Sequence, residues 1–135
     1  MKKLISQNDS FYIAGHRGMV GSAITRSLKK KGYCSNGAKG RLFVRNKEAL
    51  DLRDFKKVLD WFKANKPEVV ILAAAKVGGI LANVSFPYDF LSENLRIQQN
   101  VIEAAMENGT KRLLFLGSSC IYPKKSKIPI TEEEL

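Results

Sequence analysis

The stretch FYIAGHRGMVG, residues 11–21, decides how the rest of the chain is interpreted. Its four leading apolar residues predict a short strand that runs into a turn containing Gly15, Gly18 and Gly21, and a helical pattern follows at once. The first glycine permits the sharp turn, the second lets backbone N–H groups approach an anion, and the third lets helix and strand pack closely. The free N–H groups and the dipole of the following helix favour a phosphate there.

The spacing of these glycines is GxxGxxG, whereas the usual dinucleotide fingerprint is GxGxxG. The bare pattern is therefore also compatible with a purely structural turn. The strand before it and the helix after it are the context in which such a turn binds a dinucleotide. We therefore predict a dinucleotide site at this turn.

The segments that follow predict alternating strands and helices. A helix from Gly18, with a buried stripe that begins at Met19 and Val20, is stopped by Gly32. Residues 80–88 are expected to form a loop that ends in Pro87. Further strands are expected at 41–45, 69–73 and 112–117, and further helices at 52–65, with Asp51 as N-cap, and at 89–108, closed by Gly109. The apolar strand 69–73 suits the middle of a parallel sheet, so the predicted fold class is α/β, a Rossmann-like doubly wound parallel sheet that is incomplete.

Composition is that of one soluble domain over residues 1–135, with 44% hydrophobic and 27% charged residues. No apolar run approaches the roughly 18 residues of a membrane span, and MKKLISQNDS at the N-terminus lacks the apolar region of a signal peptide. We expect a cytoplasmic protein. Two cysteines are too few for a disulfide framework, so both are expected as reduced thiols, Cys34 exposed and Cys120, by composition, buried.

The formal charge of +10 could attract nucleic acid, an anionic membrane or a small polyanion. The lysine clusters lie on helix ends or loops and are not interleaved with aromatic residues that could stack on bases. We therefore expect solvated surface, with no nucleic-acid or membrane partner. A nucleotide with several phosphates would still be drawn to such a protein.

The end of the second predicted strand carries Arg45, Asn46 and Lys47, with no acid until Glu48. In this fold an acidic residue near this point hydrogen-bonds the ribose 2′-OH of NAD, whereas a basic residue accommodates the 2′-phosphate of NADP. Together with Arg17 in the glycine turn, these bases favour NADP over NAD. The alternative is that Arg45 and Lys47 only solvate the strand end.

Later segments add weaker signals. Alanines 73–75 leave room for a flat group at a strand end, although small residues also simply pack well. Ser118 and Ser119 follow the last strand, where chemistry occurs in this architecture, yet by composition they are turn residues. Asn94, in mid-helix, either faces solvent or has a buried polar role. Apolar residues of helix 89–108 spread over more than one stripe, which indicates a second partner, either a later helix or another subunit.

Four segments together closely resemble the GDP-L-fucose synthase family of extended short-chain dehydrogenase/reductases: GHRGMVGSAI (15–24), AAAKVGGI (73–80), ENLRIQQNVIEAA (93–105) and LLFLGSSCIYPK (113–124). The likeness covers nearly all of the chain, and the second and fourth segments are far more specific than any glycine pattern. It implies an NADP-binding Rossmann domain. It also implies a two-part reaction, epimerisation of GDP-4-keto-6-deoxy-D-mannose at C3 and C5 followed by hydride transfer from NADPH to C4, which yields GDP-L-fucose.

The resemblance also implies residue roles. Arg17 and Lys47, with Arg45, would face the 2′-phosphate, while Asp51 and Leu52 would lie by the adenine. Ser118 would hydrogen-bond the 4-keto oxygen, and Cys120 would be general acid or base in the epimerisations, a task that suits a thiol with an ordinary pKa of about 8.5. The cofactor would further contact the turn and the last strand end through Gly15, His16, Arg17, Gly18, Met19, Val20, Gly21, Leu116, Gly117, Ser118 and Ser119.

The chain departs from the family pattern in one respect. Members need a Tyr-x-x-x-Lys pair and a histidine partner for the cysteine, but no tyrosine here has a lysine four positions later, and the single histidine, His16, is in the turn. We therefore expect the first portion of a longer enzyme, inactive alone, that pairs as a homodimer through helix 89–108 and holds no metal. The alternatives are a catalytically dead dinucleotide-binding or interaction module, or another nucleotide-sugar epimerase or dehydratase.

Overall fold

The computed structural model describes residues 4–35 and 37–135. Four parallel strands form one sheet in the order β2-β1-β3-β4. The strands are β1 Phe11–Ala14, β2 Leu42–Val44, β3 Val69–Leu72 and β4 Arg112–Phe115. The chain starts in the middle of the sheet, moves to one edge and then crosses to the other side. The carboxyl ends of β1 and β3 therefore form the switch point at which open α/β sheets bind ligands.

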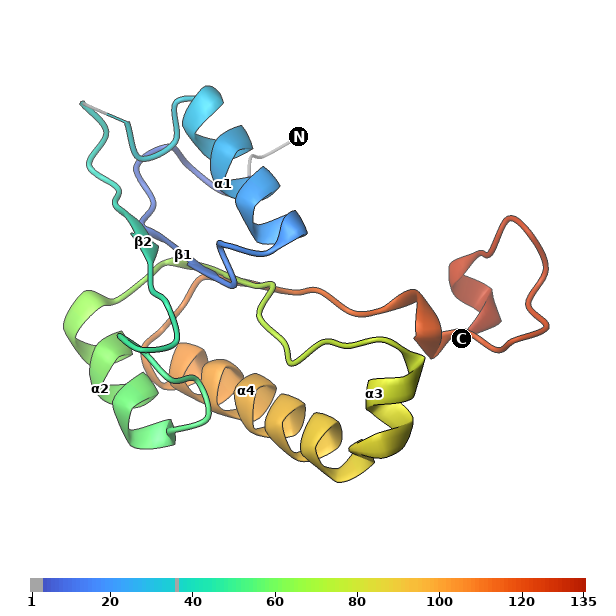
Figure 1. Ribbon diagram of the computed structural model, residues 1–135. Helices are drawn as coiled ribbons and strands as arrows, with labels where there is room; N and C mark the ends of the chain where they lie inside the picture. The colour runs from blue at the N-terminus through green and yellow to red at the C-terminus, as the bar shows by residue number, and fades with distance from the viewer. Residues whose placement is uncertain (1–3, 36) are drawn as a thin grey trace.

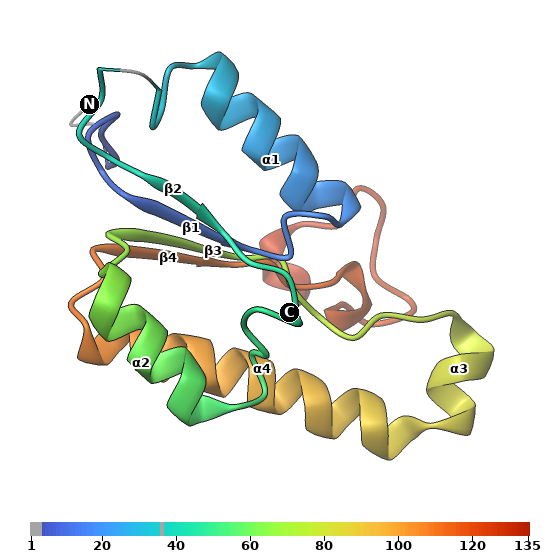
Figure 2. The ribbon, with the colours of Figure 1, turned by 60° about the vertical axis from the view of Figure 1, so that its left-hand side comes forward.

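Helices cover both faces of the sheet, as Figures 1 and 2 show. Helix α1 (Met19–Lys30) lies on one face, and α2 (Phe55–Asn65) and α4 (Pro87–Glu107) lie together on the other. The short helix α3 (Ile80–Ser85) precedes α4. This arrangement confirms the predicted α/β class with a doubly wound parallel sheet.

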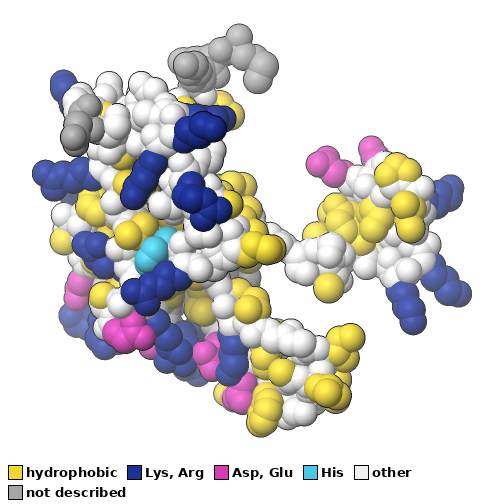
Figure 3. All heavy atoms as spheres, turned by 45° about the horizontal axis from the view of Figure 1, so that its top comes forward, with side chains coloured by type: hydrophobic (Ala, Val, Ile, Leu, Met, Phe, Trp, Pro, Cys, Tyr) yellow, Lys and Arg dark blue, Asp and Glu magenta, His cyan; other side chains and the backbone are white. Residues whose placement is uncertain are grey.

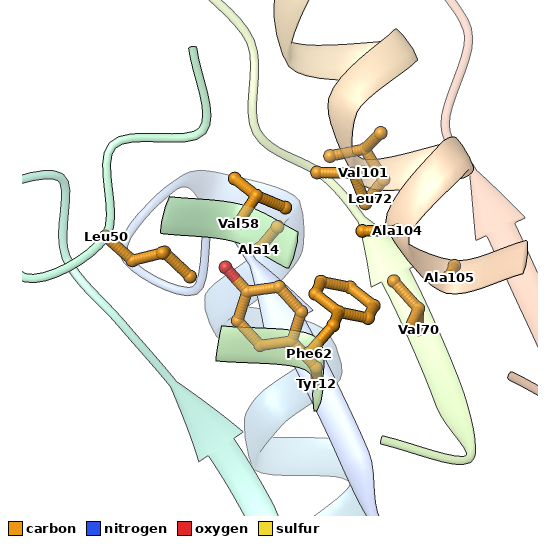
Figure 4. Packing of buried hydrophobic residues seen from close by; sticks show 10 residues of the cluster. All are labelled: Tyr12, Ala14, Leu50, Val58, Phe62, Val70, Leu72, Val101, Ala104 and Ala105. Atoms are coloured by element: carbon orange, nitrogen blue, oxygen red, sulfur yellow. The ribbon is translucent and has the colours of Figure 1, made fainter. Parts of the chain in front are cut away.

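The core consists of two apolar layers on either side of the two central strands. Every residue of β1 and β3 is buried, and alternate side chains point to opposite faces. Phe11 and Ile13 pack with Leu28 of α1. The larger layer lies between the sheet and the α2–α4 pair (Figure 4) and is formed by Tyr12, Ala14, Leu50, Val58, Phe62, Val70, Leu72, Val101, Ala104 and Ala105. Each large side chain there contributes roughly 1.5–3 kcal/mol by burial, so this layer fixes the sheet end on which the candidate site is built.

The edge strand β4 and the outer surface of α4 are more exposed. All four residues of the edge strand β4 are exposed, and α4 exposes Leu91, Leu95, Ile102 and Met106. The predicted excess of apolar residues on this helix is therefore confirmed, while the partner that would cover them stays a prediction. After β4 the chain forms two single-turn helices, η1 (Ser119–Ile121) and η2 (Glu132–Glu134), and extends away from the main body (Figures 1 and 3).

Two predicted boundaries are wrong. The N-cap of α2 is Asp54, whose carboxylate accepts a hydrogen bond from the Lys57 amide at 3.1 Å, so the helix begins three residues later than expected. Asp51 instead forms an ion pair with Arg53. The expected loop 80–88 contains α3, and Pro87, predicted to end that loop, begins α4. Proline suits a first helical position because the amide it lacks would be unbonded there anyway.

Three burial expectations also need correction. The first turn of α1 is exposed, with Met19 at 87% and Val20 at 45%, because it projects past the strand ends instead of packing on the sheet. Cys34, expected at the surface, is half-buried, and its thiol donates to the Asp9 carbonyl oxygen at 3.6 Å. Cys120, expected by composition to be buried, is exposed, because the segment after β4 leaves the sheet. Among the described residues, no helix has the length and apolar character needed to cross a membrane.

Candidate functional site

The glycine turn between β1 and α1 is held by close backbone packing. Gly15 has φ +83°, and a Cβ atom there would come within 2.5 Å of the Ala73 carbonyl oxygen. A Cβ at Gly21 would overlap the carbonyl oxygen of Gly15. Any larger residue at either position would force the turn away from β3 or from the helix. The predicted roles of these glycines in the sharp turn and in close packing are therefore confirmed.

Gly18 differs from both, because it is the N-cap of α1. Its φ of −71° is open to any residue, and a Cβ there would meet only the Gly15 carbonyl oxygen, at 3.3 Å. No side chain of the described residues caps this helix, and its first turn carries no acid. The first amide N–H groups of α1 are thus available to an anion, which the helix dipole also favours.

A cleft of about 750 Å³ opens at the carboxyl ends of β1, β2 and β3. Ten predicted cofactor residues line it, namely Gly15, His16, Arg17, Gly18, Met19, Val20, Arg45, Lys47, Asp51 and Leu52. Gly21 is buried behind the turn. A second cavity, of about 590 Å³, lies beside the segment that precedes β1 and is lined by Ile5, Ser6, Gln7, Asn8, Gly32, Tyr33, Ser35, Gly37 and Ala38. None of those residues is basic, so a phosphate is better matched by the first cleft.

The predicted residues after β4 lie at the same edge of the sheet but do not line this cleft. The Leu116 amide donates to the Leu72 carbonyl oxygen at 3.1 Å, which extends the pairing of β4 with β3 by one residue. Beyond it, Gly117, Ser118, Ser119 and Cys120 are exposed. The Ser118 hydroxyl accepts a hydrogen bond from the Cys120 amide at 3.2 Å and so caps the η1 turn.

Charge is distributed unevenly around the cleft. Arg17, Arg45 and Lys47 are exposed at its rim. Asp51 accepts two short hydrogen bonds from Arg53, Nε to Oδ1 at 2.9 Å and Nη2 to Oδ2 at 2.7 Å, and these bonds lower the pKa of Asp51 to about 2. The carboxylate is therefore already paired, and the three rim bases keep their attraction for an anion.

A further ionic cluster, which the sequence analysis did not predict, joins α4 to Arg53, in the segment before α2, and to Lys76, in the segment after β3. Glu93 accepts from Lys76 Nζ at 2.6 Å and from Arg53 Nη1 at 3.0 Å, and the bond from Lys76 is the main cause of its lowered pKa. The next residue, Asn94, accepts from the Lys76 amide at 2.7 Å and donates to the Lys76 carbonyl oxygen at 3.0 Å. Of the two roles left open for Asn94, the polar role fits better than a solvent-facing one, although the side chain is half-buried rather than buried.

These features fit a dinucleotide. The first amides of α1 have no side-chain cap, and the flanking bases match phosphates. His16 Nδ1 is buried without a hydrogen-bond partner in the described part of the chain, which leaves one polar atom of the turn unsatisfied. In addition, Ala73, Ala74 and Ala75 line the cleft with small side chains, as a flat group requires.

Comparison with known proteins decides the family, because the model of the NAD dependent epimerase/dehydratase family matches residues 11–135. This chain belongs to that family. Within it, the chain is similar to GDP-L-fucose synthase of Escherichia coli (strain K12), with 50% identity over 124 residues, and to GDP-L-fucose synthase 1 of Arabidopsis thaliana, with 47% identity over 135 residues. The resemblance expected from the four segments is thereby confirmed.

This epimerase/dehydratase chain covers only part of those relatives. The matches take in 92% and 100% of the chain but 37% and 40% of the two synthases. Among solved structures, a GDP-mannoheptose C4 reductase from Campylobacter jejuni with NADP bound superposes with a TM-score of 0.86 at 40% identity, over 97% of this chain and 40% of that one. A GDP-L-fucose synthetase from Naegleria fowleri bound to NADP gives 0.77 at 29% identity, over 96% and 37%.

Proposed function

We propose that residues 1–135 form an NADP-binding Rossmann domain, and that they are the cofactor portion of an enzyme that converts GDP-4-keto-6-deoxy-D-mannose to GDP-L-fucose. The observation that carries the proposal is the uncapped N-terminus of α1 at the edge of a cleft whose rim holds Arg17, Arg45 and Lys47. The names of the relatives supply the sugar and the reaction class.

The cofactor would be held by the chain's own residues in three ways. The amides of the turn from Gly15 to Gly21 hydrogen-bond the pyrophosphate. Arg17, Arg45 and Lys47 attract the negatively charged 2′-phosphate of NADP. NAD carries an uncharged 2′-hydroxyl at this position. Leu52 and the apolar part of the cleft pack against the adenine. When bound, NADPH supplies the hydride that reduces C4 of the keto sugar.

Ser118 and Cys120 would act on the sugar. The Ser118 hydroxyl hydrogen-bonds and polarises the 4-keto oxygen, which also acidifies the neighbouring C3 and C5 protons. Cys120 would be the general base or acid on one face of the sugar, and the histidine partner that the resemblance implies would exchange the proton on the opposite face. Both side chains are exposed and follow the strand end beside β3, so a substrate can reach them.

The chain alone is expected to be inactive, because its 135 residues contain neither a Tyr-x-x-x-Lys pair to protonate the C4 oxygen nor a second histidine. The test is NADPH consumption with GDP-4-keto-6-deoxy-D-mannose, measured against the Ser118→Ala variant, together with calorimetric titration of NADP. We expect NADP binding without turnover. Turnover above the Ser118→Ala background would refute the expected inactivity, and absence of NADP binding would refute the proposed cofactor role.

A second candidate is a non-catalytic dinucleotide-binding module, favoured by the same missing pair. The two candidates differ at Cys120. In a longer polypeptide that contains this chain, the first predicts that Cys120→Ala abolishes epimerisation while hydride transfer to an already epimerised keto sugar is retained. If such a polypeptide binds NADP but neither activity is detected, the second candidate is supported instead.

A further inference from the structure

The single tryptophan of the chain, Trp61 on α2, lies directly beneath a rim base of the cleft. The guanidinium carbon of Arg45 is 5.7 Å from the centre of the Trp61 ring, within the range of a cation–π contact. The Trp61 ring also packs against two other aromatic rings. Its centre is 4.5 Å from that of Tyr12 in a tilted arrangement and 5.5 Å from that of Phe43 in an edge-to-face one.

Arg45 has few other constraints. It is exposed at the end of β2, and its Nη1 donates to the carbonyl oxygen of Val44 at 2.8 Å. None of the ion pairs found among residues 4–35 and 37–135 involves it. The indole face and one backbone carbonyl therefore hold the guanidinium, and its other N–H groups are left for a ligand in the cleft.

We propose that Trp61 is a positioning residue that holds Arg45 toward the 2′-phosphate and thereby contributes to the choice of NADP over NAD. The inference rests on the proposed function. A guanidinium binds phosphate through a planar fork, so its orientation matters as well as its charge. An aromatic face that restrains this plane before binding reduces the side-chain entropy lost when the phosphate arrives. Because NAD lacks the 2′-phosphate, the restraint helps NADP alone.

The competing interpretation is that Trp61 only packs in the aromatic cluster. Both interpretations predict that a smaller side chain lowers stability. Only the positioning role predicts a change in the ratio of the NAD and NADP dissociation constants, and only if Arg45 is present. A double-mutant cycle between the two residues separates the interpretations.

The experiment measures dissociation constants of both dinucleotides by calorimetry for the wild type, Trp61→Leu, Arg45→Leu and the double variant. A cation–π contact at an exposed site is worth roughly a two- to five-fold change in affinity. We therefore expect Trp61→Leu to reduce the preference for NADP by about that factor, and to have no further effect on the preference when Arg45 is already leucine. The matched control is Phe11→Leu, which removes an aromatic ring from the other core layer, where it packs against Tyr33, and should leave the preference unchanged.

A second measurement does not depend on a core substitution. Because Trp61 is the only tryptophan, tryptophan emission excited selectively over that of the tyrosines reports on this residue alone. Adenosine 2′,5′-bisphosphate should change that emission by engaging Arg45, adenosine 5′-monophosphate should change it less, and Arg45→Leu should remove the difference. Equal losses of NAD and NADP affinity in Trp61→Leu, or emission changes independent of the 2′-phosphate, would overturn the inference. If the wild type binds neither dinucleotide, the proposed function fails first and the inference falls with it.

Discussion

Replacing Gly21 with alanine tests how the glycine turn is built. The added Cβ would overlap the Gly15 carbonyl oxygen and come within 3.1 Å of the His16 Cα atom. These neighbours are backbone atoms and cannot rotate away, so the cost should lie near the upper end of the roughly 1–3 kcal/mol typical of overpacked sites, about 3 kcal/mol. The matched control is Gly18→Ala, where the nearest atom would be 3.3 Å away.

The assay for this pair is thermal unfolding followed by circular dichroism. Unfolding entropies average about 2.1 cal/mol/K per residue, so for 135 residues a loss of about 3 kcal/mol lowers Tm by roughly 10 °C. In Gly18→Ala the only expected cost is that alanine is a poorer N-cap residue than glycine. The Tm of this variant should therefore fall by a few degrees at most. A Gly21→Ala variant as stable as the wild type would refute the close strand–helix packing on which the turn depends.

Three further predictions concern the cleft and α4. If the pyrophosphate binds at the first turn of α1 as proposed, Gly18→Ala should weaken NADP binding about tenfold in calorimetry, because the added Cβ would enter the space proposed for it; unchanged affinity would exclude this phosphate position. Since pairing with Arg53 lowers the pKa of Asp51 to about 2 in the folded state, its contribution to stability is present above about pH 4 and is lost as the pH falls from 4 to 2. In Arg53→Gln the urea midpoint of unfolding should therefore change less with pH between 4 and 2 than in the wild type. An unchanged pH dependence would count against the Asp51–Arg53 pair. If α4 pairs two subunits, Leu95→Glu should shift a light-scattering mass from dimer to monomer while Arg96→Glu on the same helix leaves the dimer intact, and a wild-type monomer would contradict the pairing.

Much of the fold could be read from local patterns. The apolar runs of β1 and β3 are buried at every position, and such runs predict central parallel strands. The glycine turn was recognisable because its requirements are steric and local: Gly15 needs positive φ and Gly21 needs close approach. The positive φ of Gly15 and the contact of Gly21 with Gly15 involve residues close in sequence, so the glycine spacing together with the flanking strand and helix patterns indicates them.

The features that were predicted wrongly or missed depend on contacts that local sequence patterns do not show. Helix α3 has six residues, too few to show a helical period. Asp51 and Asp54 are both residues that suit the N-cap of α2. In the structure Arg53 pairs with Asp51, and Asp54 caps the helix. The link from Glu93 to Lys76 and Arg53 spans 17 and 40 positions and exists only once α4 packs beside α2. Exposure of Cys120 likewise depends on the path of the chain after β4, which composition does not encode.

The central claim is that the phosphates of NADP are held at the first turn of α1. Amide chemical-shift mapping of the ¹⁵N-labelled chain during titration with NADP tests it most directly. We expect the largest shifts in residues 18–21, at the helix start, and in residues 45–47, at the proposed 2′-phosphate position. Shifts confined to the lining of the other cavity, such as residues 5–8, with the turn unchanged, would contradict it.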